Sequence, residues 1–197
     1  MSNPIIKMHS WFVACLFLFC QSVLASPQAS IQTTENIRWD SSLTLPDIDG
    51  KPHPGLAGAF SGCIGDFLFI AGGANFPDAT PWNGGTKTWW NTLYYKNLND
   101  ASSAWKEIKE ALPSARAYGV SIPLTDGILC IGGCDAKQCY SEVFAIRMYN
   151  EKIEIDKNWP KLPVPLANMT GAKLGNKIFL AGGQEQMKPE AATSHFF

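Results

Sequence analysis

Residues 112–133 read LPSARAYGVSIPLTDGILCIGG, and the chain repeats this pattern on either side of them. A shift of 50 residues places the stretch without a gap on residues 162–183, LPVPLANMTGAKLGNKIFLAGG. A shift back of 60 residues places its later part on residues 56–73, LAGAFSGCIGDFLFIAGG. A period of about 50 residues built from short apolar runs is typical of kelch-type propeller blades rather than of helical solenoids. The repeat therefore predicts an all-β fold, the kelch-type β-propeller.

Each copy holds the strands of one blade. Two apolar runs flank a turn, and the second run has no polar alternation, which indicates a strand buried on both faces. The Gly-Gly pair that ends this second strand indicates a backbone with positive φ or a close neighbour. The second strands are expected at residues 67–71, 128–131 and 178–181. The third and fourth strands are expected at residues 92–96, 104–108, 143–147 and 152–155.

The repeats also divide the chain into blades. We expect residues 26–197 to form a partial kelch β-propeller, which has about two full and two partial blades. Its parts are an outer strand of a closing blade at 37–46, blades at 55–113 and 114–163, and a truncated blade at 164–197. Propellers close with about four to eight blades. The chain is therefore expected to be a truncated piece of a longer propeller.

Residues 1–25 have the pattern of a signal peptide. Lys7 precedes the apolar run 11–20, and Val23 and Ala25 are small residues at the positions that a signal peptidase requires. A membrane anchor is the alternative, but the run is shorter than the roughly 20 apolar residues that span a bilayer. We expect cleavage before Ser26, a periplasmic or secreted protein, and no membrane attachment after cleavage.

The composition excludes several functional classes. A chain with 46% hydrophobic and 17% charged residues is globular, and its net charge of −1 provides no basic face for nucleic acid. Neither GxGxxG nor GxxxxGK[ST] occurs, so nucleotide chemistry has no support. The only histidines are His9, His53 and His195. None lies near Cys134 and Cys139 in sequence to complete a zinc or copper site, and they are too few for a copper oxidase on a kelch scaffold. No metal and no cofactor are expected.

Four cysteines lie beyond the signal peptide. Cys63 and Cys130 occupy strand positions and are predicted to be small core residues. Cys134 and Cys139 bracket the loop after the second Gly-Gly pair. Because exported proteins meet oxidising conditions, these two are candidates for a local disulfide.

One rim of the propeller is the expected binding face. The first strand of each blade lines the central channel, and the loops between strands two and three share a rim with the connections that enter the first strands. The longest of these loops, residues 75–90, carries amide and aromatic side chains suited to sugar hydroxyls and an apolar ring face. These are Asn75, Trp82, Asn83, Trp89 and Trp90. The alternative is that the tryptophans pack one blade on the next. Since neighbours on a strand point to opposite faces, one of Trp89 and Trp90 is expected to face the channel.

Four segments resemble the kelch-type N-acetylneuraminate epimerases, also called sialic acid mutarotases, in their cyclically permuted branch. They are GLAGAFSG (55–62), FIAGGANFPDATPWNGGTKTWWNTLYY (69–95), RAYGVSIP (116–123) and LANMTGAKLGNKIFLAGGQE (166–185). The resemblance covers most of residues 39–197. It implies a six-bladed exported propeller that interconverts the α and β anomers of N-acetylneuraminate. It also implies a catalytic Glu in a Gly-Glu motif followed by Arg; this motif does not occur here, and in the permuted order it would lie beyond Phe197.

Mutarotation requires a base, an acid and a group that holds the substrate carboxylate, and acid-base help is typically worth about 10² to 10⁴ in rate. Arg116 opens a first strand where the other copies have Leu56 and Leu166. Arginine suits a carboxylate because its fork donates two parallel bonds. We predict that Arg116 binds the carboxylate of the small sugar acid, with an ion pair to a rim acid as the alternative.

The other candidates are weaker. Asn75 and Trp89 are predicted to contact substrate, and Glu185 is a weak candidate acid because most loop glutamates are merely solvated. A kelch propeller that binds carbohydrate or protein without catalysis remains the alternative function, although it leaves the aromatic loop and the exported start unexplained. The sequence does not indicate the oligomeric state.

Overall fold

The computed structural model describes residues 43–48 and 50–197. Within these residues all regular structure is β, apart from two short 3-10 helices, η1 (Pro81–Asn83) and η2 (Pro189–Ala191). The predicted signal peptide, residues 1–25, lies outside the described residues. So does most of the predicted outer strand at 37–46, and residues 43–46 have no strand structure. No helix in the described part of the chain has the length and apolarity to cross a bilayer.

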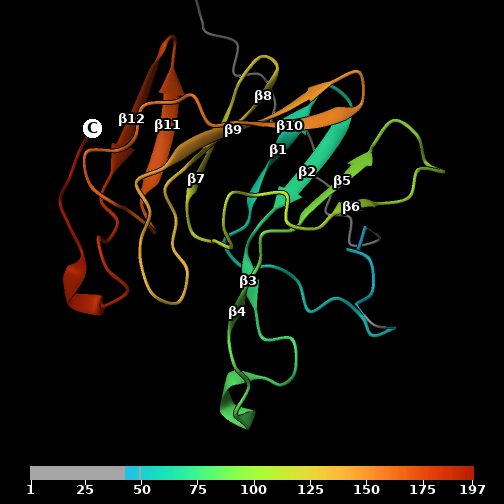
Figure 1. Cartoon of the computed structure of the whole chain (residues 1–197), viewed down its shortest axis with the longest axis horizontal. Helices are drawn as coiled ribbons and strands as arrows, with labels where there is room; N and C mark the ends of the chain where they lie inside the picture. The colour runs from blue at the N-terminus through green and yellow to red at the C-terminus, as the bar shows by residue number, and fades with distance from the viewer. Residues whose placement is uncertain (1–42, 49) are drawn as a thin grey trace, which may run out of the picture. The chain divides into compact units, whose positions relative to one another are not determined.

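Two antiparallel four-stranded sheets form two successive blades (Figure 1). The first contains β1 (Phe60–Ile64), β2 (Phe67–Ala71), β5 (Leu93–Asn97) and β6 (Lys106–Ile108) in that order. The second contains β7 (Val120–Pro123), β8 (Gly127–Ile131), β9 (Val143–Tyr149) and β10 (Lys152–Asp156). The predicted all-β fold of kelch-type propeller blades is therefore confirmed.

A third blade begins at the C-terminal end of the chain. β11 (Thr170–Leu174) pairs with β12 (Lys177–Ala181), and Phe197 exchanges backbone hydrogen bonds of 2.9 and 3.0 Å with Leu180. A separate short ladder of β3 (Ala74–Asn75) and β4 (Thr88–Trp89) closes the base of the long loop in the first blade. Figure 1 shows this loop, with η1 at its tip, projecting from the first blade.

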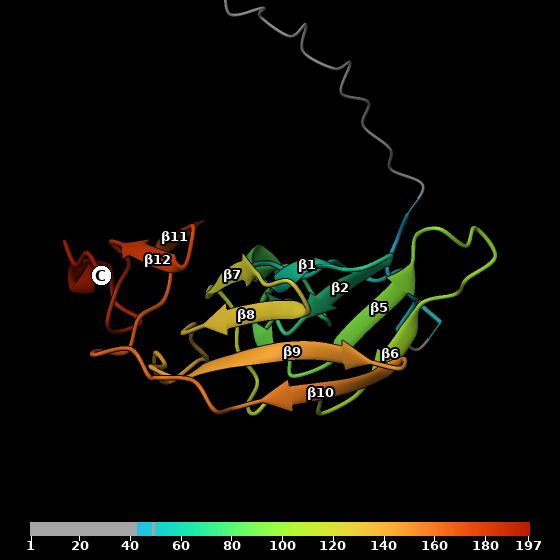
Figure 2. The same cartoon turned by 90° about the horizontal axis from the view of Figure 1, so that it is seen from above.

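The hydrophobic core lies between successive blades. Phe60 and Phe69 of the first blade pack with Phe144 and Ile146 of the second, and the rings of Phe60 and Phe144 meet edge to face at 5.8 Å. Leu166 and other residues of the third blade cover the opposite face of the second. Figure 2 shows the three sheets following one another in chain order.

This sandwich explains the burial of the second strands. All five residues of β8 are buried, as predicted for a strand covered on both faces. β2 and β12 are only partly buried, because in the described part of the chain each has a blade packed on one face alone. The prediction that Cys63 is a core residue is wrong for the same reason: it is exposed, whereas Cys130 on β8 is fully buried.

The Gly-Gly pairs join one blade to the next. Gly72 and Gly73 have φ values of +66° and +93°, a region that L side chains rarely adopt. The N–H of Gly73 donates to the carbonyl oxygen of Arg116 at 2.8 Å, and Gly133 donates in the same way to Leu166 at 2.8 Å. A Cβ atom on Gly72 would lie 2.5 Å from the Arg116 oxygen. Both predicted reasons for the pair, positive φ and a close neighbour, are confirmed.

The loops between strands two and three share one rim with the entries to the first strands. An antiparallel bridge joins Ala57 to Ala74 in the first blade and Ala117 to Cys134 in the second. Tyr118 N–H donates to Gly58 O at 2.7 Å across the blade boundary. η1 and η2 lie at the lower end of the view in Figure 1, opposite the β11–β12 turn. The expected common rim is therefore present, and we call it the loop rim.

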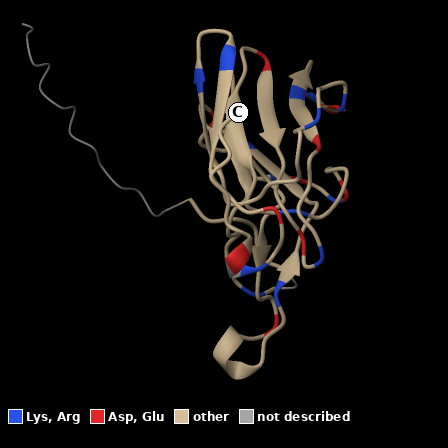
Figure 3. Ribbon diagram, turned by 90° about the vertical axis from the view of Figure 1, so that its left-hand side faces the viewer, with Lys and Arg blue, Asp and Glu red and all other residues tan. Residues whose placement is uncertain are grey.

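Basic and acidic side chains are interspersed over the described strands and loops (Figure 3). One structural ion-pair cluster ties the second blade together: Arg147 on β9 pairs with Asp126 in the β7–β8 turn and with Asp156 on β10. Its guanidinium also lies 5.9 Å from the ring centroid of Trp159. These partners fix the outer strands rather than forming a site.

Candidate functional site

A cavity of about 330 Å³ opens on the loop rim of the first blade. Its lining comes from the entry to β1, the start of the long loop, and the first residues of the next blade. Most of the lining is apolar, and the main apolar residues are Pro54, Leu56, Phe76 and Pro81. We call this the rim cavity. Its volume is at the lower end of the range usual for small-molecule sites.

Lys87 supplies the charge of the rim cavity. Its ammonium donates to the Tyr118 hydroxyl at 2.6 Å, and it lies 4.5 Å from the Tyr118 ring centroid and 5.1 Å from that of Trp89. No acidic residue lines the cavity, so Lys87 is the one formally charged group among its lining residues. The contact joins residues 31 positions apart on successive blades.

Asn75 forms part of the wall of the rim cavity, and half of its side-chain hydrogen-bonding capacity is already used. Its side chain is 7% exposed, donates to Gly55 O at 2.9 Å and accepts from Trp90 Nε1 at 2.8 Å. Its predicted role in substrate binding is thus limited to one remaining amide N–H and one remaining lone pair of Oδ1. The bond from Trp90 Nε1 fixes Trp90 against the loop, so the main role of Asn75 is to shape the cavity.

The tryptophans of the long loop differ in environment. Trp89 and Trp90 are both half-buried. Trp89 Nε1 is buried and has no hydrogen-bond partner among the described residues, and its ring contacts the Lys87 ammonium. Trp82 in η1 is 82% exposed at the loop tip. Of the three, Trp89 contacts the Lys87 ammonium but is not among the residues that line the rim cavity, so its substrate-binding role stays a prediction.

Arg116 does not face the rim cavity. Its side chain is 2% exposed and donates to Ser114 Oγ from Nε at 3.1 Å and from Nη2 at 2.7 Å. The guanidinium carbon lies 4.1 Å from the Tyr140 ring centroid. Burial lowers the pKa of Arg116, and the nearby Glu142 carboxylate offsets part of that shift. Nη1 has no partner among the described residues.

This burial argues against both interpretations of Arg116 from the sequence. A guanidinium enclosed within the second blade is not presented to a substrate carboxylate, and among the described residues it forms no ion pair with an acid. The equivalent Leu166 in the next copy is 1% exposed and belongs to the core. Leu56, the equivalent residue of the first copy, is only half-buried and lines the rim cavity, so the repeat alone did not predict the burial of Arg116.

Glu185 lies on the loop rim of the third blade and contacts His195. Its Oε1 is 2.8 Å from His195 Nε2, and both side chains are partly exposed. The same repeat position is Asn75 in the first blade and Asp135 in the second. Asp135 accepts from Tyr140 Oη at 2.6 Å and from the backbone of its own loop. All three residues therefore make contacts within their own loops. The catalytic acid role of Glu185 stays a prediction.

Cys134 and Cys139 are both free and buried, and they face each other across an antiparallel bridge. The backbone hydrogen bonds of this bridge lie on either side of the two cysteines, from Tyr140 N to Gly133 O and from Asp135 N to Gln138 O. Cys134 and Cys139 therefore occupy a non-hydrogen-bonded position of the ladder, where opposite side chains approach closely. The two thiols are free in this structure, but the Cα separation typical of such a pair suits a disulfide.

The environment of the two thiols keeps both protonated at neutral pH. Burial, and after it the neighbouring Cys139, raise the pKa of Cys134 to about 12, while Lys87 acts in the opposite direction. Burial also raises the pKa of Cys139. Within the described residues, no group of three His, Cys, Asp or Glu side chains is placed to hold a metal ion.

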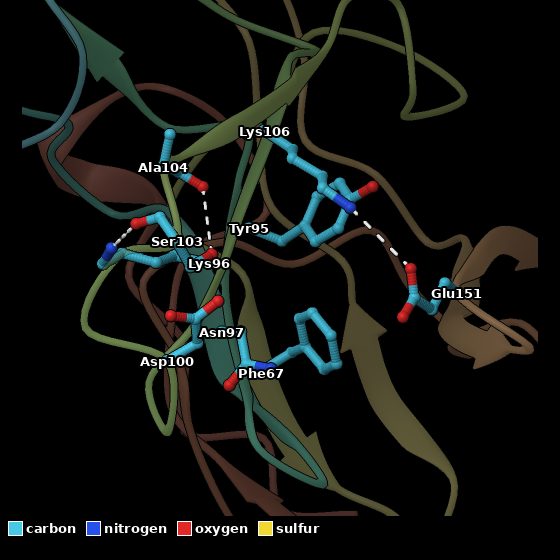
Figure 4. Close-up of a pocket in the computed structure, with 9 residues that line it drawn as sticks. All are labelled: Phe67, Tyr95, Lys96, Asn97, Asp100, Ser103, Ala104, Lys106 and Glu151. Carbon is cyan, nitrogen blue, oxygen red and sulfur yellow. Dashed lines mark hydrogen bonds and ion pairs between the residues drawn. The ribbon is translucent and has the colours of Figure 1, made fainter.

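A second cavity of about 330 Å³ lies on the outer strands of the first blade (Figure 4). Its charged groups are already engaged with protein partners. Lys106 Nζ lies 3.9 Å from Glu151, Lys96 Nζ donates to Ser103 O, and Asp100 accepts from Ser102. The rim cavity has an apolar wall and a cation that forms no ion pair within the described part of the chain, and it is therefore the better candidate.

Sequence reasoning missed Lys87 and Tyr118. Each is unremarkable in its own segment, and the pair exists only because successive blades meet at the loop rim. One signal was available: Tyr118 stands where the other copies have Gly58 and Asn168, residue types that tolerate positive φ, and in the structure all three have positive φ, at 65°, 62° and 56°. A large aromatic residue in a backbone conformation that favours glycine is a strained feature, and such features gather at functional sites.

A sequence model of the N-acetylneuraminate epimerase family matches residues 24–155. The protein of that name from Vibrio vulnificus (strain YJ016) is 32% identical over 128 residues, which are 59% of this chain and 32% of that protein. Its namesake from Haemophilus influenzae (strain PittEE) is 31% identical over 134 residues, 63% of this chain and 34% of that protein. Another from Brucella melitensis biotype 1 is 30% identical over 146 residues, 68% of this chain and 36% of that protein.

A solved structure titled "Structure of YjhT" matches with a TM-score of 0.52 and 18% identity. The match covers 74% of this chain and 44% of that chain, and it supports the propeller fold. The chain spans about a third of the length of the curated relatives that it matches.

Proposed function

Because this chain belongs to the N-acetylneuraminate epimerase family, we propose that the whole protein interconverts the α and β anomers of N-acetylneuraminate. The observation that carries the proposal is the family match over residues 24–155, which contain both the long aromatic loop and Arg116 to Tyr140. Since the chain spans about a third of its relatives, activity and substrate are proposed for the whole protein.

The reaction is an isomerisation, and atoms and electrons balance without a cofactor. A base removes the proton of the anomeric hydroxyl, the bond from the anomeric carbon to the ring oxygen breaks, and an acid protonates that oxygen. The open-chain keto acid then recloses on its other face with the reverse proton transfers. A site for this reaction must bind a carboxylate, cover an apolar ring face and keep acid and base within hydrogen-bond reach.

The rim cavity meets the binding part of these requirements. Lys87 provides positive charge, the Tyr118 hydroxyl is a hydrogen-bonding group next to it, and Leu56 and Phe76 provide an apolar wall. We assign this chain a substrate-binding role in the reaction. We also propose that the protein is exported after cleavage before Ser26, on the basis of the signal-peptide pattern in residues 1–25.

Exchange spectroscopy by NMR tests the proposal. The full-length protein is added to an equilibrium mixture of the two anomers near neutral pH, and the exchange rate between their signals is compared with that in buffer. We expect acceleration that scales with protein concentration and disappears after heat denaturation. An exchange rate equal to that in buffer would rule out the enzyme and favour a non-catalytic propeller that binds carbohydrate or protein, in which the exposed Trp82 is a natural contact.

A further inference from the structure

We propose that Lys87, rather than Arg116, binds the carboxylate of the substrate, and that the Tyr118 hydroxyl is the second donor to the same carboxylate. The proposal deepens the function given above and relies on it for the identity of the sugar acid. Its basis is the juxtaposition of one unpaired cation, one hydroxyl and an apolar wall in the rim cavity.

Lys87 has charge and hydrogen-bonding capacity to spare. An ammonium has three N–H donors, and the hydroxyl of Tyr118 accepts one of them. No ion pair with Lys87 occurs among the described residues, where only Lys106 and Lys161 of the lysines have acidic partners. The two aromatic rings beside it offset part of the cost of desolvating the cation. An anion that enters the cavity would offset the remainder.

Several contacts hold Lys87 in place. It directly precedes β4, whose ladder with β3 pairs Asn75 with Thr88 and Ala74 with Trp89. The hydrogen bond from Trp90 to Asn75 fixes the loop on the other side of β4. Lys87 therefore enters the cavity from a backbone that is anchored on the first blade, although the long loop itself projects from that blade.

Tyr118 is held equally firmly from the second blade. Its backbone N–H donates to Gly58 O at 2.7 Å, and its carbonyl accepts from Asn168 at 2.8 Å. Because its hydroxyl oxygen accepts from Lys87, the hydroxyl proton is free to donate to a ligand. Lys87 Nζ and Tyr118 Oη, 2.6 Å apart, thus present adjacent donors that suit the two oxygens of one carboxylate.

The remaining lining selects an amphipathic acid. Pro54, Leu56, Phe76 and Pro81 give the cavity an apolar wall that suits a sugar ring face or an N-acetyl methyl group. Its lining holds no acidic side chain that would repel a carboxylate. Arg116 offers no comparable surface, since its guanidinium is buried beneath Tyr140.

The test compares variants of the full-length protein in their binding of N-acetylneuraminate and of N-acetylmannosamine, a neutral sugar without the carboxylate. Lys87→Gln is one atom shorter and keeps an amide donor group, but it removes the charge. Lys137→Gln is the matched control, because Lys137 is an exposed lysine on the loop rim of the next blade. Lys87→Arg restores the charge, and Tyr118→Phe removes only the second donor. Isothermal titration gives the affinities, and thermal melting checks the fold.

We expect Lys87→Gln to weaken N-acetylneuraminate binding by about ten- to a hundredfold and to leave the neutral sugar unaffected. Lys87→Arg should recover most of the affinity, Tyr118→Phe should lose about three- to tenfold, and Lys137→Gln should bind like wild type. Equal affinity of wild type and Lys87→Gln for the acid overturns the proposal, as does a wild type that does not bind it. If Lys87→Gln does not fold, Tyr118→Phe decides, because affinity for the acid equal to that of wild type would then overturn the proposal.

The two proposals fail in different ways. Charge-dependent binding without faster anomer exchange would leave the Lys87 site standing and refute the enzymatic function. Accelerated exchange with unchanged KM in Lys87→Gln would leave the enzyme standing and refute the Lys87 site.

Discussion

Replacing Gly72 by alanine should destabilise the contact between the first and second blades. Gly72 has φ +66°, and a Cβ atom there would lie 2.5 Å from Arg116 O and 3.0 Å from Leu112 Cδ1. The same carbonyl oxygen accepts the hydrogen bond from Gly73. The matched control is Gly65→Ala in the same blade: its φ is +55°, and a Cβ there would have no atom within 4 Å.

The magnitude follows from the difference between the two sites. In both variants the left-handed backbone costs about 1 to 2 kcal/mol, partly offset because alanine also restricts the unfolded chain by about 0.4 to 1 kcal/mol. Gly72→Ala adds an overpacking cost of about 1 to 3 kcal/mol and weakens a hydrogen bond worth about 1 kcal/mol. We therefore expect its free energy of unfolding to fall about 2 to 4 kcal/mol further than that of Gly65→Ala.

Urea unfolding of the full-length protein, followed by tryptophan fluorescence, measures both variants against wild type. Their midpoints are compared at a common slope of free energy against urea concentration. Equal destabilisation by the two substitutions would show that the Gly-Gly pair is needed only for its backbone conformation. The role of Gly72 as a point of close approach between blades would then be refuted.

Two further predictions concern residues first identified in the sequence. Arg116→Leu removes a buried cation whose Nη1 has no partner among residues 43–48 and 50–197. We expect its free energy of unfolding to stay within about 1.5 kcal/mol of wild type or to rise, and its affinity for N-acetylneuraminate to change by less than about twofold. A tenfold loss of affinity measured by titration would restore Arg116 as the carboxylate-binding residue. In exported protein we expect Cys134 and Cys139 to form a disulfide worth roughly 2 kcal/mol. Non-reducing intact mass should then show a chain that begins at Ser26 and lacks two hydrogens, whereas alkylation of both cysteines after denaturation without reductant would rule the disulfide out.

The sequence predicted the blades well because the interactions that form them are local. Each blade is built from antiparallel strands that are neighbours in sequence. The apolar run of β8 and the Gly-Gly pair after it therefore indicate a buried strand and its end without information from the rest of the chain. Burial on both faces was predicted correctly for β8 and only partly for β2, because burial depends on which blade packs on the second face.

The site was predicted less well because its side chains come from different blades. The pattern placed the long loop and Arg116 on one rim, but it carried no information on where the Arg116 side chain points. Stacking on Tyr140 and hydrogen bonds to Ser114 turn it into the blade. The contact of Lys87 with Tyr118 bridges two blades, and so no single segment reveals it.

The central claim, that this chain supplies part of the substrate site of an anomer-interconverting enzyme, is tested most directly by relaxation from an anomerically enriched solution of N-acetylneuraminate. The approach to equilibrium is followed by NMR with full-length wild type, Lys87→Gln and Lys137→Gln at equal concentration. We predict that wild type and Lys137→Gln speed the relaxation alike. At subsaturating substrate, the acceleration above the buffer rate should be about ten- to a hundredfold smaller with Lys87→Gln than with wild type. Relaxation at the buffer rate with wild type, or equal rates for wild type and Lys87→Gln, would contradict the claim.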